Sequence, residues 1–78
     1  MSPGEMPSRY RPLASQRVVA AIRADIESGK LQSGDPLPTV DILCDIYDVS
    51  RMTVLKALRQ LREAGLIQTI PRYGSSVI

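Results

Sequence analysis

The sequence has no histidine, tryptophan or phenylalanine, and a single cysteine, Cys44, among its 78 residues. Without histidine, Ser-His and Cys-His catalytic pairs and imidazole-bound metal sites are excluded. One cysteine also excludes an internal disulfide framework and a cysteine-based zinc site. We therefore predict a domain that is not an enzyme, with no catalytic residue, metal site or cofactor. We interpret Cys44 as a buried packing residue rather than a redox sensor.

Long apolar runs are also absent. No stretch approaches the roughly 20 apolar residues that a transmembrane helix needs, and residues 1–12 lack the apolar core of a secretory signal. We therefore expect no membrane partner and a cytoplasmic location. The apolar fraction of 44% and the charged fraction of 23% are those of an ordinary globular chain. This length allows one small core without a deep substrate cavity.

Charge is unevenly distributed along the chain, although the net charge is only +2. Residues 39–50 contain three acidic side chains and no cation: Asp41, Asp45 and Asp48. Residues 51–78 contain one carboxylate, Glu63, and five cations: Arg51, Lys56, Arg59, Arg62 and Arg72. A basic half in a small domain is expected of a protein that binds a polyanion.

The three aspartates allow two interpretations. At i, i+4 and i+7 on a short helix they can align as a metal site, but the sequence has neither histidine nor a glycine-rich loop to complete one. We favour the second interpretation, in which their charge repels phosphates and directs a polyanion towards residues 51–78.

Apolar residues at spacings of three and four predict three helices. Thr39 and Ser50 are suited to cap the second and third of them, and Gly29 and Gly65 to end the first and third. The predicted helices are residues 13–28, 39–47 and 50–64. Their predicted apolar faces are Val18, Val19, Ile22 and Ile26; Ile42, Leu43, Ile46 and Tyr47; and Val54, Ala57, Leu58 and Leu61.

Prolines and glycines divide the rest of the chain. Residues 1–12 contain three prolines and a glycine and are predicted to be a flexible tail, which leaves residues 13–78 as one domain. Residues 34–38 cannot be helical, so we expect an extended crossing with Leu37 in the core. Strands over residues 66–70 and 75–78, joined by a turn, complete a mainly α domain with a small β-hairpin. This is a winged helix-turn-helix, with three helices and a two- or three-stranded wing sheet.

The connection between the second and third helices is short, and its residues suit a tight turn. Cys44 and Ala57 provide small side chains where the two helices meet, and Asp48 tolerates left-handed backbone better than most residues. Val49 can fill the space under the turn. This geometry presents the third helix as a DNA-reading element.

The exposed side of the third helix combines cations, hydroxyls and apolar tips. Cations and helix-end N–H groups suit phosphates, arginine or lysine suits guanine, and methionine or leucine suits a thymine methyl group. With the wing tip included, the predicted DNA-binding residues are Ser50, Arg51, Met52, Thr53, Leu55, Lys56, Arg59, Arg72, Tyr73 and Gly74.

Several motifs occur in order across residues 10–78, and together they resemble the N-terminal domain of GntR-family bacterial transcription regulators. The matching residues are Gly29-Lys30-Leu31, Gly34-Asp35, Leu37-Pro38-Thr39, residues 49–54, Ala57-Leu58, Leu61, Gly65-Leu66-Ile67, Gly74 and Val77. The resemblance implies a repressor that binds a two-fold symmetric operator as a homodimer. It also implies that Ser50, Arg51 and Thr53 contact DNA, with Arg72, Tyr73 and Gly74 at the wing tip.

The sequence departs from the family pattern at several positions. Family members place a DNA-contacting arginine at the position of Asp41, favour arginine at Leu55 and carry glycine at Arg72. The nearest cation to Leu55 is one residue later, at Lys56, and the usual glycine before Val49 is Asp48. These departures imply a non-standard operator sequence. The family also implies a C-terminal domain, absent from this chain, that binds a small-molecule effector and dimerises.

One alternative function uses the same fold. A winged helix can serve as a protein-interaction module, and the apolar side chains of Met52 and Leu55 favour that interpretation. The cations Arg51, Lys56, Arg59 and Arg72 favour DNA. Tyr73 is compatible with stacking on a sugar or with covering the wing.

Overall fold

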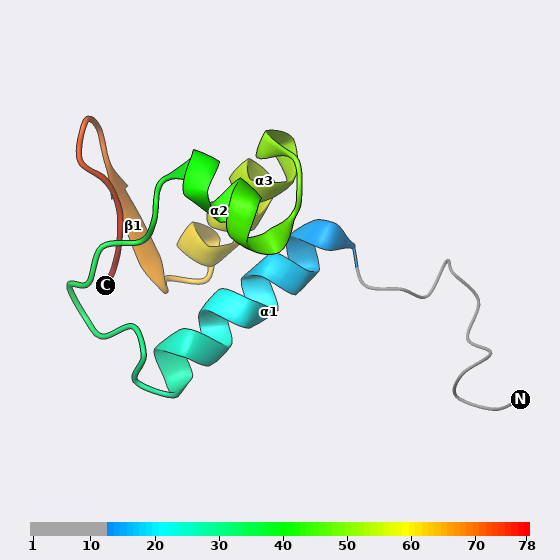
Figure 1. The fold of residues 1–78 in the computed structure, drawn as a ribbon. Helices are drawn as coiled ribbons and strands as arrows, with labels where there is room; N and C mark the ends of the chain where they lie inside the picture. The colour runs from blue at the N-terminus through cyan, green and yellow to red at the C-terminus, as the bar shows by residue number, and fades with distance from the viewer. Residues whose placement is uncertain (1–12) are drawn as a thin grey trace, which may run out of the picture.

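The computed structural model describes residues 13–78, so the predicted tail over residues 1–12 lies outside the described residues. The elements are α1 (Ala14–Glu27), α2 (Val40–Tyr47), α3 (Arg51–Glu63), β1 (Ile67–Ile70) and β2 (Gly74–Val77). The helix α1 crosses beneath α2 and α3, and the hairpin of β1 and β2 stands beside them (Figure 1). The predicted winged helix-turn-helix is confirmed.

Local capping decides where α2 and α3 begin, as predicted. The Thr39 hydroxyl accepts a hydrogen bond from the Ile42 N–H, and the Ser50 hydroxyl accepts one from the Thr53 N–H. Gly29 and Gly65 follow the ends of α1 and α3 with φ of +85° and +76°, a conformation that glycine adopts without a Cβ penalty.

The turn between α2 and α3 adopts the predicted left-handed backbone, with φ of +53° at Asp48. The Val49 N–H donates to the Cys44 carbonyl at 3.1 Å and closes the turn. Ala57 is fully buried where α3 meets its neighbours. Cys44 packs against the core but is half-buried, so the prediction of a buried residue was too strong: α2 lies at the surface.

The core is built around α3, which contacts α1, α2 and β1. Leu37, from the crossing before α2, is buried there as predicted. The buried apolar residues are Val18, Ile22, Leu37, Leu43, Val54, Ala57, Leu58, Leu61, Ile67 and Val77.

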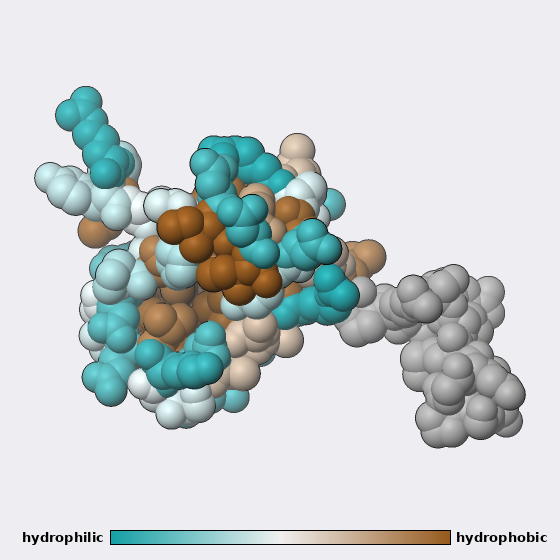
Figure 2. Space-filling model, in the orientation of Figure 1, coloured by the Kyte–Doolittle hydropathy of each residue, from teal (hydrophilic) through white to brown (hydrophobic). Residues whose placement is uncertain are grey.

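The prediction that Ile42 and Ile46 belong to the buried side of α2 was wrong. Their exposed fractions are 50% and 58%. The side of α2 that meets the core consists of Val40, Leu43, Cys44 and Tyr47. At 100° per residue, Ile42 and Ile46 lie on the opposite side of the helix, where the described residues provide no second element to cover them. A hydrophobic patch lies over α2 in Figure 2.

The extended crossing before α2 runs beside β2 and forms an isolated bridge between Pro36 and Ser76. The Gly34 N–H donates to the Val77 carbonyl at 2.8 Å, and the Leu37 N–H donates to the Ser75 carbonyl at 2.9 Å. The regular sheet has only two strands, with Ile70 paired to Gly74. The strand β1 begins one residue later than predicted, and β2 begins one residue earlier than predicted.

We predict that Tyr47 makes the fold sensitive to alkaline pH. Burial raises the pKa of the Tyr47 phenol above its ordinary value, and the Asp25 carboxylate adds to the rise. The folded state therefore holds this proton more tightly than the unfolded state. Its stabilisation is complete below about pH 10 and is lost as the pH rises through the folded-state pKa. The free energy of unfolding, measured with urea between about pH 9 and 11, should show this loss. The loss should be smaller in Tyr47→Phe. If stability fell equally with pH in the variant, Tyr47 would not be its cause.

Candidate nucleic-acid interface

The start of α3 and the tip of the wing project on the same side of the molecule, away from the C-terminal end of α1 (Figure 1). Ser50 caps the first turn of α3 by accepting a hydrogen bond from the Thr53 N–H, and the Ser50 and Thr53 hydroxyl oxygens lie 3.0 Å apart. A hydroxyl has two acceptor lone pairs and one proton. The exposed Ser50 can therefore cap the helix and still bind an outside group.

Arg51, the first residue of α3, pairs with Asp41 in the first turn of α2. The distance from Arg51 Nη1 to Asp41 Oδ1 is 2.7 Å, and both side chains are mostly exposed. The sequence analysis favoured a repulsive charge as the role of Asp41 and missed this contact. The contact joins two helices, so local sequence patterns did not indicate it.

The outward side of α3 carries the predicted mixture of apolar and charged side chains. Met52 is 66% exposed and Leu55 is 44% exposed. Lys56 is also exposed, whereas Thr53 is half-buried. The structure therefore presents these residues to a ligand, with Thr53 partly withdrawn by its contact with Ser50.

Five of the ten predicted residues line two grooves beside α3: Leu55, Tyr73 and Gly74 line one, and Lys56 and Arg59 line the other. Leu55 lines a groove shared with the wing, where Tyr73 and Gly74 form the facing wall. Thr39 and Val40, at the start of α2, form its end. This groove has the wing on one side and the reading helix on the other, an arrangement suited to following a nucleic-acid backbone.

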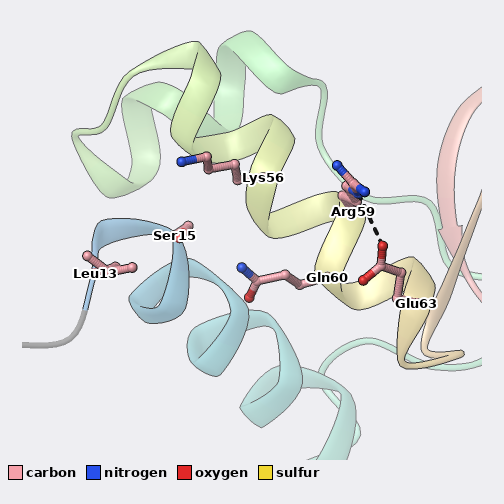
Figure 3. A pocket seen from close by; sticks show the side chains of 6 residues that line it. All are labelled: Leu13, Ser15, Lys56, Arg59, Gln60 and Glu63. Carbon is pink, nitrogen blue, oxygen red and sulfur yellow. Dashed lines mark hydrogen bonds and ion pairs between the residues drawn. The ribbon is translucent and has the colours of Figure 1, made fainter.

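Lys56 and Arg59 line the second groove, opposite Leu13 and Ser15 at the start of α1 (Figure 3). Arg59 donates from Nε to Glu63 Oε1 at 3.1 Å, an exposed pair one turn apart. Lys56 has no carboxylate within ion-pair distance among residues 13–78. Lys56 is therefore the more available cation of the two.

The wing tip is a tight turn with a left-handed backbone. The Tyr73 N–H donates to the Ile70 carbonyl at 3.0 Å, and Arg72 and Gly74 have φ of +72° and +83°. Tyr73 is 85% exposed. The tip therefore holds Arg72 and Tyr73 away from the core, where both side chains are free to contact a partner.

Arg62 connects α3 to the wing through a contact that the sequence analysis did not predict. It donates from Nη1 to the Thr69 hydroxyl at 3.2 Å, and the Thr69 and Ser75 hydroxyls lie 2.9 Å apart across the hairpin. This chain of contacts links the wing to α3. The partner of Arg62 lies on another element, so local sequence patterns could not indicate it.

Within residues 13–78, no group of three His, Cys, Asp or Glu side chains is placed to hold a metal ion. The same part of the chain contains no helix that is both long enough and apolar enough to cross a membrane.

Several curated proteins resemble this chain. It is 41% identical over 68 residues to the mannosyl-D-glycerate transport/metabolism system repressor MngR of Escherichia coli, an alignment that covers 87% of this chain and 28% of that protein. It is 36% identical over 55 residues to the HTH-type transcriptional regulator YydK of Bacillus subtilis, covering 70% and 23% of the two chains. The chain thus spans about a quarter of the length of these relatives.

Solved structures share the fold. The crystal structure of YydK from Bacillus subtilis superposes with a TM-score of 0.77 at 33% identity, over 85% of this chain and 29% of that one. The structure of AraR(DBD) in complex with operator ORX1 superposes with a TM-score of 0.86 at 27% identity, over 100% of this chain and 90% of that one.

The family model described as bacterial regulatory proteins, gntR family, matches residues 14–77, which include every described helix and strand. This match covers most of the chain and agrees with the winged helix seen in the structure. It is a family of regulators rather than of enzymes. The chain therefore belongs to the GntR family of bacterial regulatory proteins.

Proposed function

We propose that residues 13–78 form the DNA-binding domain of a bacterial transcription regulator, a repressor that recognises a two-fold symmetric operator as a homodimer. The observation that carries the proposal is the common projection of the first turn of α3 and the wing tip, with exposed cations on both (Figure 1). AraR(DBD), which has this fold, was solved with operator DNA, and MngR is named a repressor.

The docking that this surface supports places the start of α3 in the major groove and the wing at the neighbouring minor groove. Phosphate contacts then come from cations and hydroxyls, and base contacts from the first turns of α3. The residues proposed to contact DNA are Ser50, Arg51, Met52, Thr53, Leu55, Lys56, Arg59, Arg72, Tyr73 and Gly74.

The alignment with MngR covers 28% of that protein. We propose that the remainder of a longer protein supplies dimerisation and binds a small-molecule effector. The decisive experiment is selection of bound duplexes from a random pool, using the domain joined to a dimerising partner. Enrichment of a two-fold symmetric sequence is expected. Retention of duplexes without enrichment would refute sequence-specific recognition.

Arg51 and Arg72 are expected to contribute differently to recognition. Arg51 is the first residue of α3, which the proposal places in the major groove. There a guanidinium can bind O6 and N7 of guanine, a contact worth about 1–3 kcal/mol of discrimination. Arg72 lies at the wing tip, where the minor groove mainly distinguishes A·T from G·C. We expect Arg51→Ala to weaken the selected duplex far more than a scrambled one and to remove preference at one base pair per half-site.

Arg72→Ala is the matched variant because it removes the same side chain from the same surface. It should weaken the selected and scrambled duplexes by similar factors and lower the salt slope by about one. Fluorescence anisotropy with both duplexes measures both effects. If Arg72→Ala removed base preference and Arg51→Ala did not, recognition would reside in the wing.

One observation favours a second function, a protein-interaction module. Ile42, Ile46 and Met52 are each at least half exposed. Such a module should bind its partner without any enriched duplex. Ile46→Ser would lower the affinity of the domain for that partner protein and leave its affinity for any DNA unchanged.

A further inference from the structure

The ion pair between Asp41 and Arg51 joins the two helices across the helix-turn-helix. Asp41 belongs to the first turn of α2 and Arg51 is the first residue of α3, ten positions later. The 2.7 Å distance is that of a charge-assisted hydrogen bond. Within residues 13–78, Asp41 is the only carboxylate within ion-pair distance of Arg51.

Helix electrostatics explain why these two side chains meet. The N-terminal end of a helix carries partial positive charge, which favours Asp41 in α2 and disfavours Arg51 in α3. Turning the guanidinium towards Asp41 offsets that repulsion. Both side chains are largely exposed, at 84% for Asp41 and 65% for Arg51, so water and salt screen the pair.

The pair leaves most of the guanidinium free. Arginine has five N–H donors in a planar fork, and Asp41 occupies one of them through Nη1. The remaining donors can still form two hydrogen bonds with guanine. A guanidinium held in one orientation loses less conformational entropy when it binds, and the neighbouring carboxylate disfavours a phosphate at the same place.

We infer that Asp41 is a positioning residue that holds Arg51 for base contact and directs it away from phosphate, and so sharpens the sequence preference of α3. This inference rests on the proposed function. It predicts that Asp41 acts on specificity through Arg51, whereas a merely repulsive charge would weaken all DNA equally.

The test compares Asp41→Ala and Asp41→Asn with the matched control Asp45→Ala, one turn further along α2. Asp45 is exposed and has no ion pair or hydrogen bond among residues 13–78 that would be lost. Each variant is measured on the selected duplex and on one altered at the base pair that Arg51→Ala identifies. Asp41→Ala should lower discrimination between the two duplexes by about 1.4- to 5-fold, the range of exposed ion pairs.

The same measurement in an Arg51→Ala background separates the mechanisms. There, Asp41→Ala should no longer change discrimination, because the side chain that it positions is gone. Asp41→Asn, which keeps an oxygen acceptor, should recover part of the lost discrimination. Asp45→Ala should strengthen both duplexes by the same factor.

Three outcomes decide the matter. A loss of discrimination that depends on Arg51 supports the inference. Equal strengthening of both duplexes by Asp41→Ala and Asp45→Ala would overturn it while leaving the proposed function intact. Failure of the unaltered domain to prefer any duplex would refute the proposed function itself, and with it a role for Asp41 in specificity.

Discussion

Raising the salt concentration from about 50 mM to about 200 mM is expected to weaken duplex binding by this domain by about 40-fold. The surface proposed to contact DNA carries four cations: Arg51, Lys56, Arg59 and Arg72. Arg51 is assigned to base contact, which leaves three cations for phosphates. Each neutralised phosphate releases counterions and adds about 0.9 to the slope of log affinity against log salt. Three phosphate contacts therefore correspond to a slope of about −2.7.

The ion pairs on this surface decide which cations dominate the salt effect. Arg51 and Arg59 have carboxylate partners, whereas Lys56 has none among residues 13–78. Lys56→Ala should therefore reduce the slope by about one. Lys30 follows the end of α1 and lines neither groove, so it is the matched control, and Lys30→Ala should leave the slope unchanged. Anisotropy titrations across this salt range measure it, and a slope near zero in the unaltered domain would contradict phosphate-dominated binding.

Features set by neighbours in the chain were predictable from the sequence. Thr39 and Ser50 cap their helices because a hydroxyl can reach an N–H three residues later. Asp48 adopts left-handed backbone at the turn, and Gly65 does so after α3. The exposed side of α3 was also predictable from the spacing of its apolar residues. These residues form one clear stripe, and several elements contact α3.

Features that depend on how elements meet were not predictable. Four apolar residues of α2 fit two different faces, and only contact with the core selects Leu43 and Tyr47 over Ile42 and Ile46. The pairing of Asp41 with Arg51 joins two helices, and the contact of Arg62 with Thr69 joins α3 to the wing. Net charge along the sequence cannot distinguish such pairs from free charges.

The largest expected effect on stability comes from Leu61→Ala. Leu61 is fully buried in α3, the helix that contacts α1, α2 and β1. Removing its side chain loses apolar burial and leaves a cavity, at a cost of about 2–5 kcal/mol. A domain of this size has only about 4–12 kcal/mol of total stability. Urea unfolding should therefore show a large part of the stability lost, with little change in the urea m-value.

Leu55→Ala is the matched control because it removes the same atoms from the same helix. Leu55 is 44% exposed beside the wing groove, so its truncation should cost less than about 1 kcal/mol. The two variants should also differ in their affinity for DNA. Leu61→Ala should bind the selected duplex normally once its folded fraction is accounted for, since it changes no proposed contact. Leu55→Ala should stay folded and bind more weakly. Equal destabilisation by both variants would mean that α3 does not bury the face that contains Leu61. The face of α3 proposed to contact DNA would then have to be revised as well.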